Sequence, residues 1–157
     1  MDRFVSNFTN RLDAKGRVSI PASFRAVLAR DGYDGLCVLP ALDHPVLDAG
    51  GNALFAEIDR LLEGLAPYSA ERDEISTALL GTSEVLKVDA EGRVILTDSL
   101  KSYAGIKDQV TFVGHGHKFQ IWEPETFRVH LEEARAKARE LRRRIGEGRT
   151  AIAETRQ

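Results

Sequence analysis

Two stretches of this chain share the pattern Asp-Ala-x-Gly-Arg-Val, and each therefore places an arginine directly after a glycine. RLDAKGRVSIPASF begins at Arg11, and KVDAEGRVILTDSL begins seventy-six residues later at Lys87. A guanidinium presents a planar fork of donors that fits a phosphate or the edge of a guanine. It also pairs well with a nearby carboxylate. The sequence therefore leaves two interpretations of Arg17 and Arg93, as anion-binding groups or as structural ion pairs within a hairpin.

The residues in front of each arginine predict a tight turn. Asp13 and Asp89 have the side chain that accepts backbone N–H groups a few residues further on. Gly16 and Gly92 supply the backbone freedom that such a turn needs. We interpret these four residues as structural parts of the turns.

Charge separates the two copies. Lys15 is basic, whereas Glu91 at the matching position is acidic. Arg11 adds another positive charge in front of the first turn. We therefore predict that the first turn binds anions more strongly, through Arg17 and Lys15, with Arg11 and Arg93 as additional contacts.

An internal repeat governs how the fold is predicted. Each copy is typical of a strand, a tight turn, a second strand and a short helix, followed by further strands. Residues 52–65 and 69–80 predict two helices that connect the halves, the first with an apolar face formed by Leu54, Ile58, Leu61 and Leu65. Residues 124–145 predict a long closing helix with an apolar seam at Phe127, Leu131, Ala134, Ala138, Leu141 and Ile145.

The predicted boundaries follow from this pattern. Residues 1–51 form the first repeat, 52–82 the connecting helices, 83–126 the second repeat, and 127–157 the closing helix with a flexible tail beyond Gly146. The fold class is α+β.

Composition excludes several classes of protein. The chain has 157 residues, a net charge of −2, and no apolar run near the roughly 20 residues of a membrane-spanning helix. The N-terminal sequence lacks the basic and then apolar order of a signal peptide, so a cytoplasmic location is expected. The single Cys37 lies in an apolar run and is interpreted as a small buried side chain.

Catalytic and cofactor signals are weak. His115 and His117 have a spacing that puts both on one side of a strand, but no further ligand residues lie close in sequence to complete a metal site. Ser23 and Ser99 lack the glycines of a nucleophile elbow, and no phosphate-binding or dinucleotide-binding loop is present. We expect no enzyme, no cofactor and no metal.

The closing helix carries a dense group of cations, namely Arg135, Lys137, Arg139, Arg142, Arg143 and Arg144. Glutamates are interspersed among them, which favours a solvated face on a helix whose apolar seam packs against another subunit. A second surface for DNA or for a partner is the alternative.

The two repeats, together with YAGI and VGHGHKFQIW, resemble the MraZ family of bacterial transcriptional regulators over roughly residues 1–143. This resemblance implies a fold of two pseudo-symmetric AbrB-like (SpoVT-AbrB) swapped-hairpin β repeats around a small β-barrel-like core. It also implies ring-like homo-oligomers that bind short direct repeats in double-stranded DNA. Contact with DNA through Arg17 and Lys15 is implied as well, with Arg93 at the second arginine of the motif.

The function expected on this basis is sequence-specific DNA binding that regulates the division and cell-wall gene cluster from the protein's own promoter. The expected location is the cytoplasm, in association with the nucleoid. A non-catalytic scaffold ring without specific DNA binding, with its arginines buried in hairpin ion pairs, is the alternative.

Overall fold

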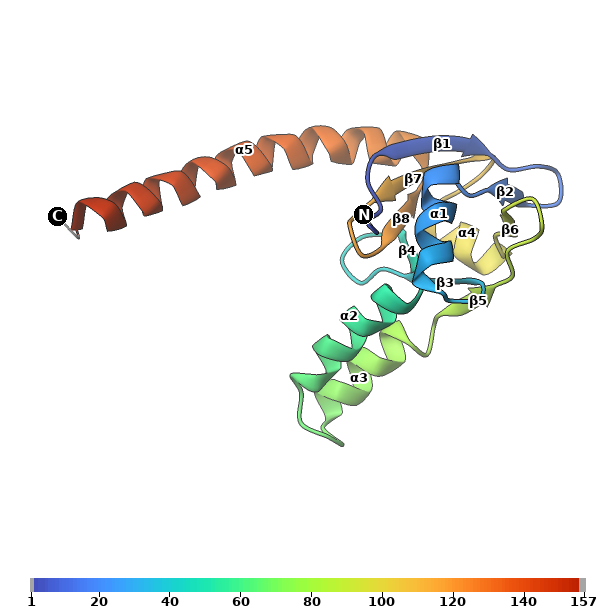
Figure 1. Ribbon diagram of the computed structural model, residues 1–157, viewed down its shortest axis with the longest axis horizontal. Coiled ribbons are helices and arrows are strands. Elements are labelled where there is room, and N and C mark those ends of the chain that lie inside the picture. The colour runs from blue at the N-terminus through green and yellow to red at the C-terminus, as the bar shows by residue number, and fades with distance from the viewer. Residues whose placement is uncertain (1, 156–157) are drawn as a thin grey trace. The chain divides into compact units, whose positions relative to one another are not determined.

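The computed structural model describes residues 2–155, and the side chains of residues 2–148. The chain divides into two compact units, Met1–Pro124 (unit 1) and Glu125–Gln157 (unit 2), which are described separately. Unit 1 combines helices with antiparallel strands, so the α+β class is confirmed (Figure 1).

Unit 1 is built on an open six-stranded antiparallel sheet. Its strands lie in the order β1 (Asn7–Arg11), β7 (Gln109–Gly114), β8 (Phe119–Trp122), β4 (Leu47–Gly50), β3 (Leu36–Pro40) and β5 (Glu84–Leu86). Among the described residues β1 and β5 form opposite edges and do not pair, so the expected barrel-like core is wrong. Each edge strand leads directly into a turn that takes the chain to β2 (Arg17–Ser19) or β6 (Arg93–Ile95). These two strands pair with each other as a separate ribbon instead of closing the sheet.

The two halves of unit 1 exchange strands. β1 of the first half pairs with β7 of the second, and β5 of the second half pairs with β3 of the first. β4 and β8 join the halves at the centre of the sheet. The strand order therefore reads the same from either edge when the halves are interchanged, and neither half builds its sheet alone.

The main core lies under two short helices that follow the ribbon strands, α1 (Ala22–Asp31) and α4 (Asp98–Ala104). Phe24 on α1 is almost fully buried and packs against Phe112 and Phe119 of the sheet. Leu100 on α4 is buried at the matching position of the second half. Burying side chains of this size contributes about 1.5–3 kcal/mol each. The core therefore holds α1 and α4 in place, and with them the ribbon strands that lead into these helices.

The helices α2 (Asn52–Glu63) and α3 (Ala70–Leu79) form a hairpin that projects from the sheet (Figure 1). The hairpin and β3 together form a second core. Cys37 and Leu39 of β3 pack in it, whereas Leu36 and Val38 pack in the main core. Successive strand residues point to opposite faces, so β3 is buried on both. The buried residues of α2 are Leu54, Ile58 and Leu62. The predicted apolar face is therefore wrong at Leu61, which is 48% exposed.

The described part of unit 2 lies in the helix α5 (Pro124–Thr155), whose first residue ends unit 1. The helix begins where predicted but continues through Gly146, where the sequence predicted the start of a flexible tail. The last two residues of that predicted tail, 156 and 157, lie outside the described residues. No helix among the described residues is long and apolar enough to cross a membrane.

Candidate functional site

The two turns predicted from the repeat meet at the β2–β6 ribbon. Val18 pairs with Val94 at its centre, Arg17 lies opposite Ile95, and Ser19 lies opposite Arg93. The ribbon is extended at both ends in the same way, because the N–H of Ile20 donates to the carbonyl of Gly92 and the N–H of Leu96 donates to that of Gly16, at 3.0 and 3.1 Å. The ribbon is thus pseudo-symmetric about the Val18–Val94 pair.

In the first turn, Asp13 organises both the backbone and the arginine. Its Oδ1 accepts the backbone N–H groups of Lys15 and Arg17, each at 2.9 Å, and its Oδ2 accepts the Nε–H of Arg17 at 2.6 Å. Gly16 adopts a φ of +79°, a conformation that a side chain would strain. One carboxylate therefore fixes the turn and also aims the guanidinium.

The second turn repeats this geometry. Asp89 accepts the backbone N–H groups of Glu91 and Arg93 at 2.9 Å each, and its Oδ2 accepts the Arg93 Nε–H at 2.9 Å. Gly92 also has a φ of +79°. The aspartates and glycines therefore occupy equivalent places in the two turns.

Hydrogen bonds within the turns shift the pKa values of the charged groups there. The backbone N–H of Arg17 is the main group that lowers the pKa of Asp13, and the backbone N–H of Arg93 does the same for Asp89. The Asp89 carboxylate in turn raises the pKa of Arg93. The turns therefore hold their aspartates ionised below the pH at which an isolated carboxyl group would take up a proton.

Both arginines lie on the outward face of the ribbon. Val18 and Val94 are buried, whereas the residues on either side of each valine are exposed or half-exposed. Because Arg17 lies opposite Ile95, it is the diagonal neighbour of Arg93, at a separation of about 7–8 Å for such pairs. The fold therefore combines the two arginines, seventy-six residues apart in sequence, into one surface.

Both arginines form the hairpin ion pair, and they differ in how much of the guanidinium it occupies. Arg17 pairs with Asp13 through Nε, yet its side chain stays 32% exposed and its Nη groups make no hydrogen bond to any described residue. Arg93 is 26% exposed, and its Nη2 lies 3.4 Å from the Glu91 carboxylate as well. The Nη groups of Arg17 are thus unoccupied by any described residue, whereas those of Arg93 are partly occupied by Glu91.

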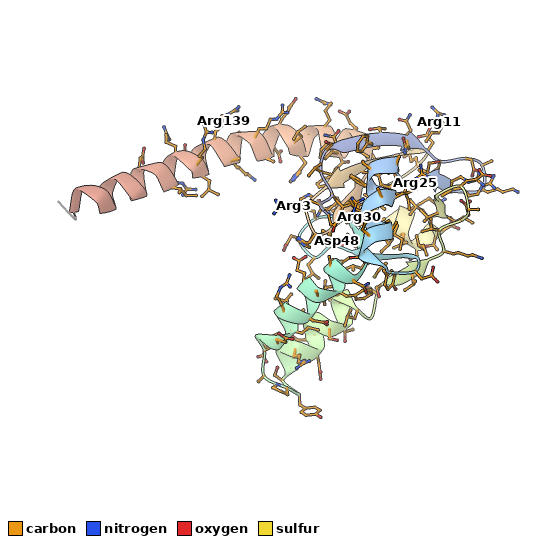
Figure 2. All side chains as sticks on the ribbon, viewed as in Figure 1. Arg3, Arg11, Arg25, Arg30, Asp48 and Arg139 are labelled. Atoms are coloured by element: carbon orange, nitrogen blue, oxygen red, sulfur yellow. The ribbon has the colours of Figure 1, made fainter. Side chains whose placement is uncertain are left out.

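Two further cations reach the turns from the opposite halves of unit 1. Arg25 of α1, labelled in Figure 2, donates from Nη1 to the carbonyl of Glu91 at 3.3 Å. It lies so close to Gly92 that a methyl group there would collide with it. Lys101 of α4 takes the matching place, with its Nζ 3.8 Å from the position of a Cβ at Gly16. Neither residue is among the predicted site residues, although the repeat keeps a basic residue at both positions.

The remaining predicted contacts are peripheral. Lys15 is exposed at the tip of the first turn and makes no ion pair with any described residue. Arg11, labelled in Figure 2, ends β1. It lies 4.0 Å from the Asp108 carboxylate, and the two side chains are 70% and 74% exposed. Such a solvated pair contributes little to stability, so Arg11 remains available to a ligand.

The other candidates are found elsewhere in unit 1. His117 faces the carboxylate of Glu57 on α2. No group of three potential metal ligands occurs in the part of the chain that the structure describes. Cys37 is fully buried, and burial raises the pKa of its thiol.

Comparisons with known proteins bear on this geometry. The family model described as "MraZ protein, putative antitoxin-like" matches residues 78–146. The transcriptional regulator MraZ of Methylocella silvestris is 70% identical over 145 residues, which cover 92% of this chain and 88% of that protein. This chain belongs to the MraZ family. The proteins of the same name from Beijerinckia indica and Azorhizobium caulinodans are 69% and 63% identical, over 92% and 94% of this chain and 88% and 94% of theirs.

Membership of the MraZ family places the chain among transcriptional regulators, a class that is not catalytic. The relatives extend across both turns, whereas the family model covers only the second turn and the residues around it. The β2–β6 ribbon and its paired turns bring Arg17, Arg25, Arg93 and Lys101 together in unit 1 of this MraZ chain.

Proposed function

We propose that this protein is a sequence-specific DNA-binding regulator of the division and cell-wall gene cluster. It binds short direct repeats in its own promoter as a ring-like homo-oligomer, in the cytoplasm and in association with the nucleoid. Residues 1–51 and 83–126 are its two AbrB-like swapped-hairpin repeats, 52–82 the connecting helices, and 127–157 the closing segment. The exchange of strands between the halves supports this assignment.

One observation carries the proposal: a two-stranded ribbon presents two arginines held by aspartates on its outward face. The major groove of DNA admits a two-stranded ribbon, and an arginine fork there recognises guanine. Arg17, with its free Nη groups, reads a base edge, while Lys15 and Arg11 contact phosphates beside it. Arg93 contributes less, because Glu91 competes for its guanidinium.

One ribbon makes few contacts and binds weakly. An oligomer compensates for this weakness when it presents several ribbons to repeats spaced by about one turn of DNA, roughly 10 base pairs. Phosphate contacts then make the affinity fall steeply with salt, although the whole chain has a net charge of −2.

The test uses the full-length protein and a duplex that carries the direct repeats upstream of its own operon. Arg17→Ala is expected to abolish specific binding measured by fluorescence anisotropy, with an unchanged melting temperature. Arg3→Ala is the matched control, because Arg3 is an exposed arginine away from the turns (Figure 2). Wild-type affinity of Arg17→Ala for the repeats would remove Arg17 from the site. A wild-type protein that does not distinguish the repeats from a scrambled duplex would favour the alternative function, a scaffold ring without specific DNA binding.

A further inference from the structure

The apolar seam of α5 is flanked on both sides by cations. Ala134, Ala138, Leu141 and Ile145 repeat at spacings of four and three residues, as in a helix that packs against another helix. Leu141 and Ile145 are 51% and 47% exposed. The described part of unit 2 is a single helix, so nothing within this unit covers that part of the seam.

The positions that border this seam hold only positive charge. In a heptad with Ala138 and Ile145 at position a, the e and g positions between residues 134 and 145 are Arg135, Lys137, Arg142 and Arg144. None of these four makes an ion pair with any described residue. Glu140 lies outside the seam, where it pairs with Arg143. We call the four apolar residues with their four cations the basic seam.

The charges of the basic seam disfavour pairing between two copies of α5. In a parallel pair, g residues face e residues of the other helix, which sets Lys137 beside a second Arg142. In an antiparallel pair, e faces e and g faces g, which again sets cation against cation. A stable partner must therefore bring acidic residues beside an apolar surface.

The α2–α3 hairpin has the complementary charge. Residues 52–79 contain six Asp or Glu and two Arg, whereas residues 134–145 contain six Lys or Arg and one Glu. Five of the hairpin's carboxylates are exposed and make no ion pair with any described residue: Asp59, Glu63, Glu71, Asp73 and Glu74. The hairpin is thus an acidic surface whose charges are unmatched.

The hairpin also has an apolar surface on which the apolar residues of the basic seam can pack. A cavity of about 240 Å³ lies beside α2, and its lining includes Leu54, Ile58 and Leu61. Leu61 and Leu42, at the margin of this cavity, are 48% and 56% exposed. Large side chains such as those of Leu141 and Ile145 suit such a recess, because their insertion removes apolar area from water on both surfaces.

We propose that the basic seam of α5 docks on the acidic α2–α3 hairpin of a second copy of this chain. The contact joins two different surfaces, so each copy binds one neighbour through its basic seam and another neighbour through its hairpin. Such a head-to-tail contact closes into a ring when the rotation between copies allows it. This inference rests on the oligomer of the proposed function and names the surfaces that build it.

The experiment reverses each side of the contact and measures mass by light scattering after size exclusion. Arg135→Glu with Arg142→Glu, and separately Asp59→Lys with Glu63→Lys, are each expected to reduce the assembly to monomer. The control is Arg139→Glu with Arg143→Glu, because it makes the same charge change outside the seam and should leave the mass unchanged. Melting temperatures verify that every variant is folded.

Mixing the two reversed variants gives the decisive result. The new glutamates on α5 of one variant then face the new lysines on α2 of the other. At the alternate contacts, the unchanged α5 of the hairpin variant faces the unchanged hairpin of the α5 variant. The mixture is expected to regain the wild-type mass, although neither variant assembles alone. Contact of α5 with its own chain, with DNA or with another protein predicts no such recovery.

The outcomes separate this inference from the proposed function. An assembled wild type whose mass both reversals leave unchanged refutes the contact while the oligomer stands. A wild type that is monomeric at every concentration refutes the ring and the contact together. Specific binding of the repeats, tested through Arg17, is judged independently of either result.

Discussion

Replacement of Arg17 by lysine separates base reading from simple charge. The Nε–H of Arg17 is held by Asp13 at 2.6 Å, while its Nη groups make no hydrogen bond to any described residue. Lysine keeps the positive charge but loses the planar fork and the Nε donor. A bidentate arginine–guanine contact is worth about 1–3 kcal/mol of discrimination, and each 1.4 kcal/mol is a factor of ten. Arg17→Lys is therefore expected to reduce the preference for the repeats over a scrambled duplex by about 5- to 140-fold.

The matching change at Arg93 should have a smaller effect. Its Nη2 lies 3.4 Å from the Glu91 carboxylate, so part of its fork is already occupied. Anisotropy titrations of both variants against specific and scrambled duplexes, at one salt concentration, give the two ratios directly. A wild-type ratio for Arg17→Lys would refute base reading by Arg17, because Arg17 would then act only as a charge near phosphate. A larger loss of discrimination in Arg93→Lys than in Arg17→Lys would refute the difference between the two turns.

Three further predictions follow from the same geometry. Lys15→Ala is expected to weaken binding to specific and scrambled duplexes alike and to reduce the slope of log K against log salt by about 1, measured by titrations at several salt concentrations. The pKa values of Asp13 and Asp89 lie below the usual 3.8, so their stabilising effect is present above that value and is lost as pH falls through the lower folded values. Replacing both aspartates by asparagine should therefore flatten the pH dependence of the free energy of unfolding below about pH 4. Urea denaturation at several pH values measures this dependence, and the same dependence in the variant as in the wild type would contradict the prediction. Cys37 is fully buried with a raised pKa, so a thiol reagent should react with it only after unfolding, and rapid labelling of the folded protein would show that the interpretation is wrong.

Much of the site can be predicted from local sequence, because its chemistry is local. Each turn is organised by an aspartate whose partners lie two and four residues further along the chain. The residue types and their spacing therefore predict the turn. The repeat predicts that it forms twice, and the exchange of Lys15 for Glu91 predicts that the two copies differ in charge.

Other features of the site depend on pairs far apart in the sequence. Arg25 lies over a turn sixty-six residues away, and no local pattern indicates which turn it reaches. Leu61 fits the helical spacing of the buried face of α2, yet it is exposed because the packing of α2 buries Leu62 instead. The barrel-like closure fails for a similar reason, since the pairing of β2 with β6 leaves the edge strands apart.

The sequence by itself determined the two turns, the residues that build them and the imbalance of charge between them, because hydrogen bonds within five residues dictate such a structure. Only the tertiary structure decided that β2 and β6 pair with each other. That register places Arg17 and Arg93 on one face and brings Arg25 and Lys101 to the turns of the opposite halves. It arises from the burial of Val18 and Val94 in the main core, to which both halves contribute, an interaction of the whole fold and not of either repeat.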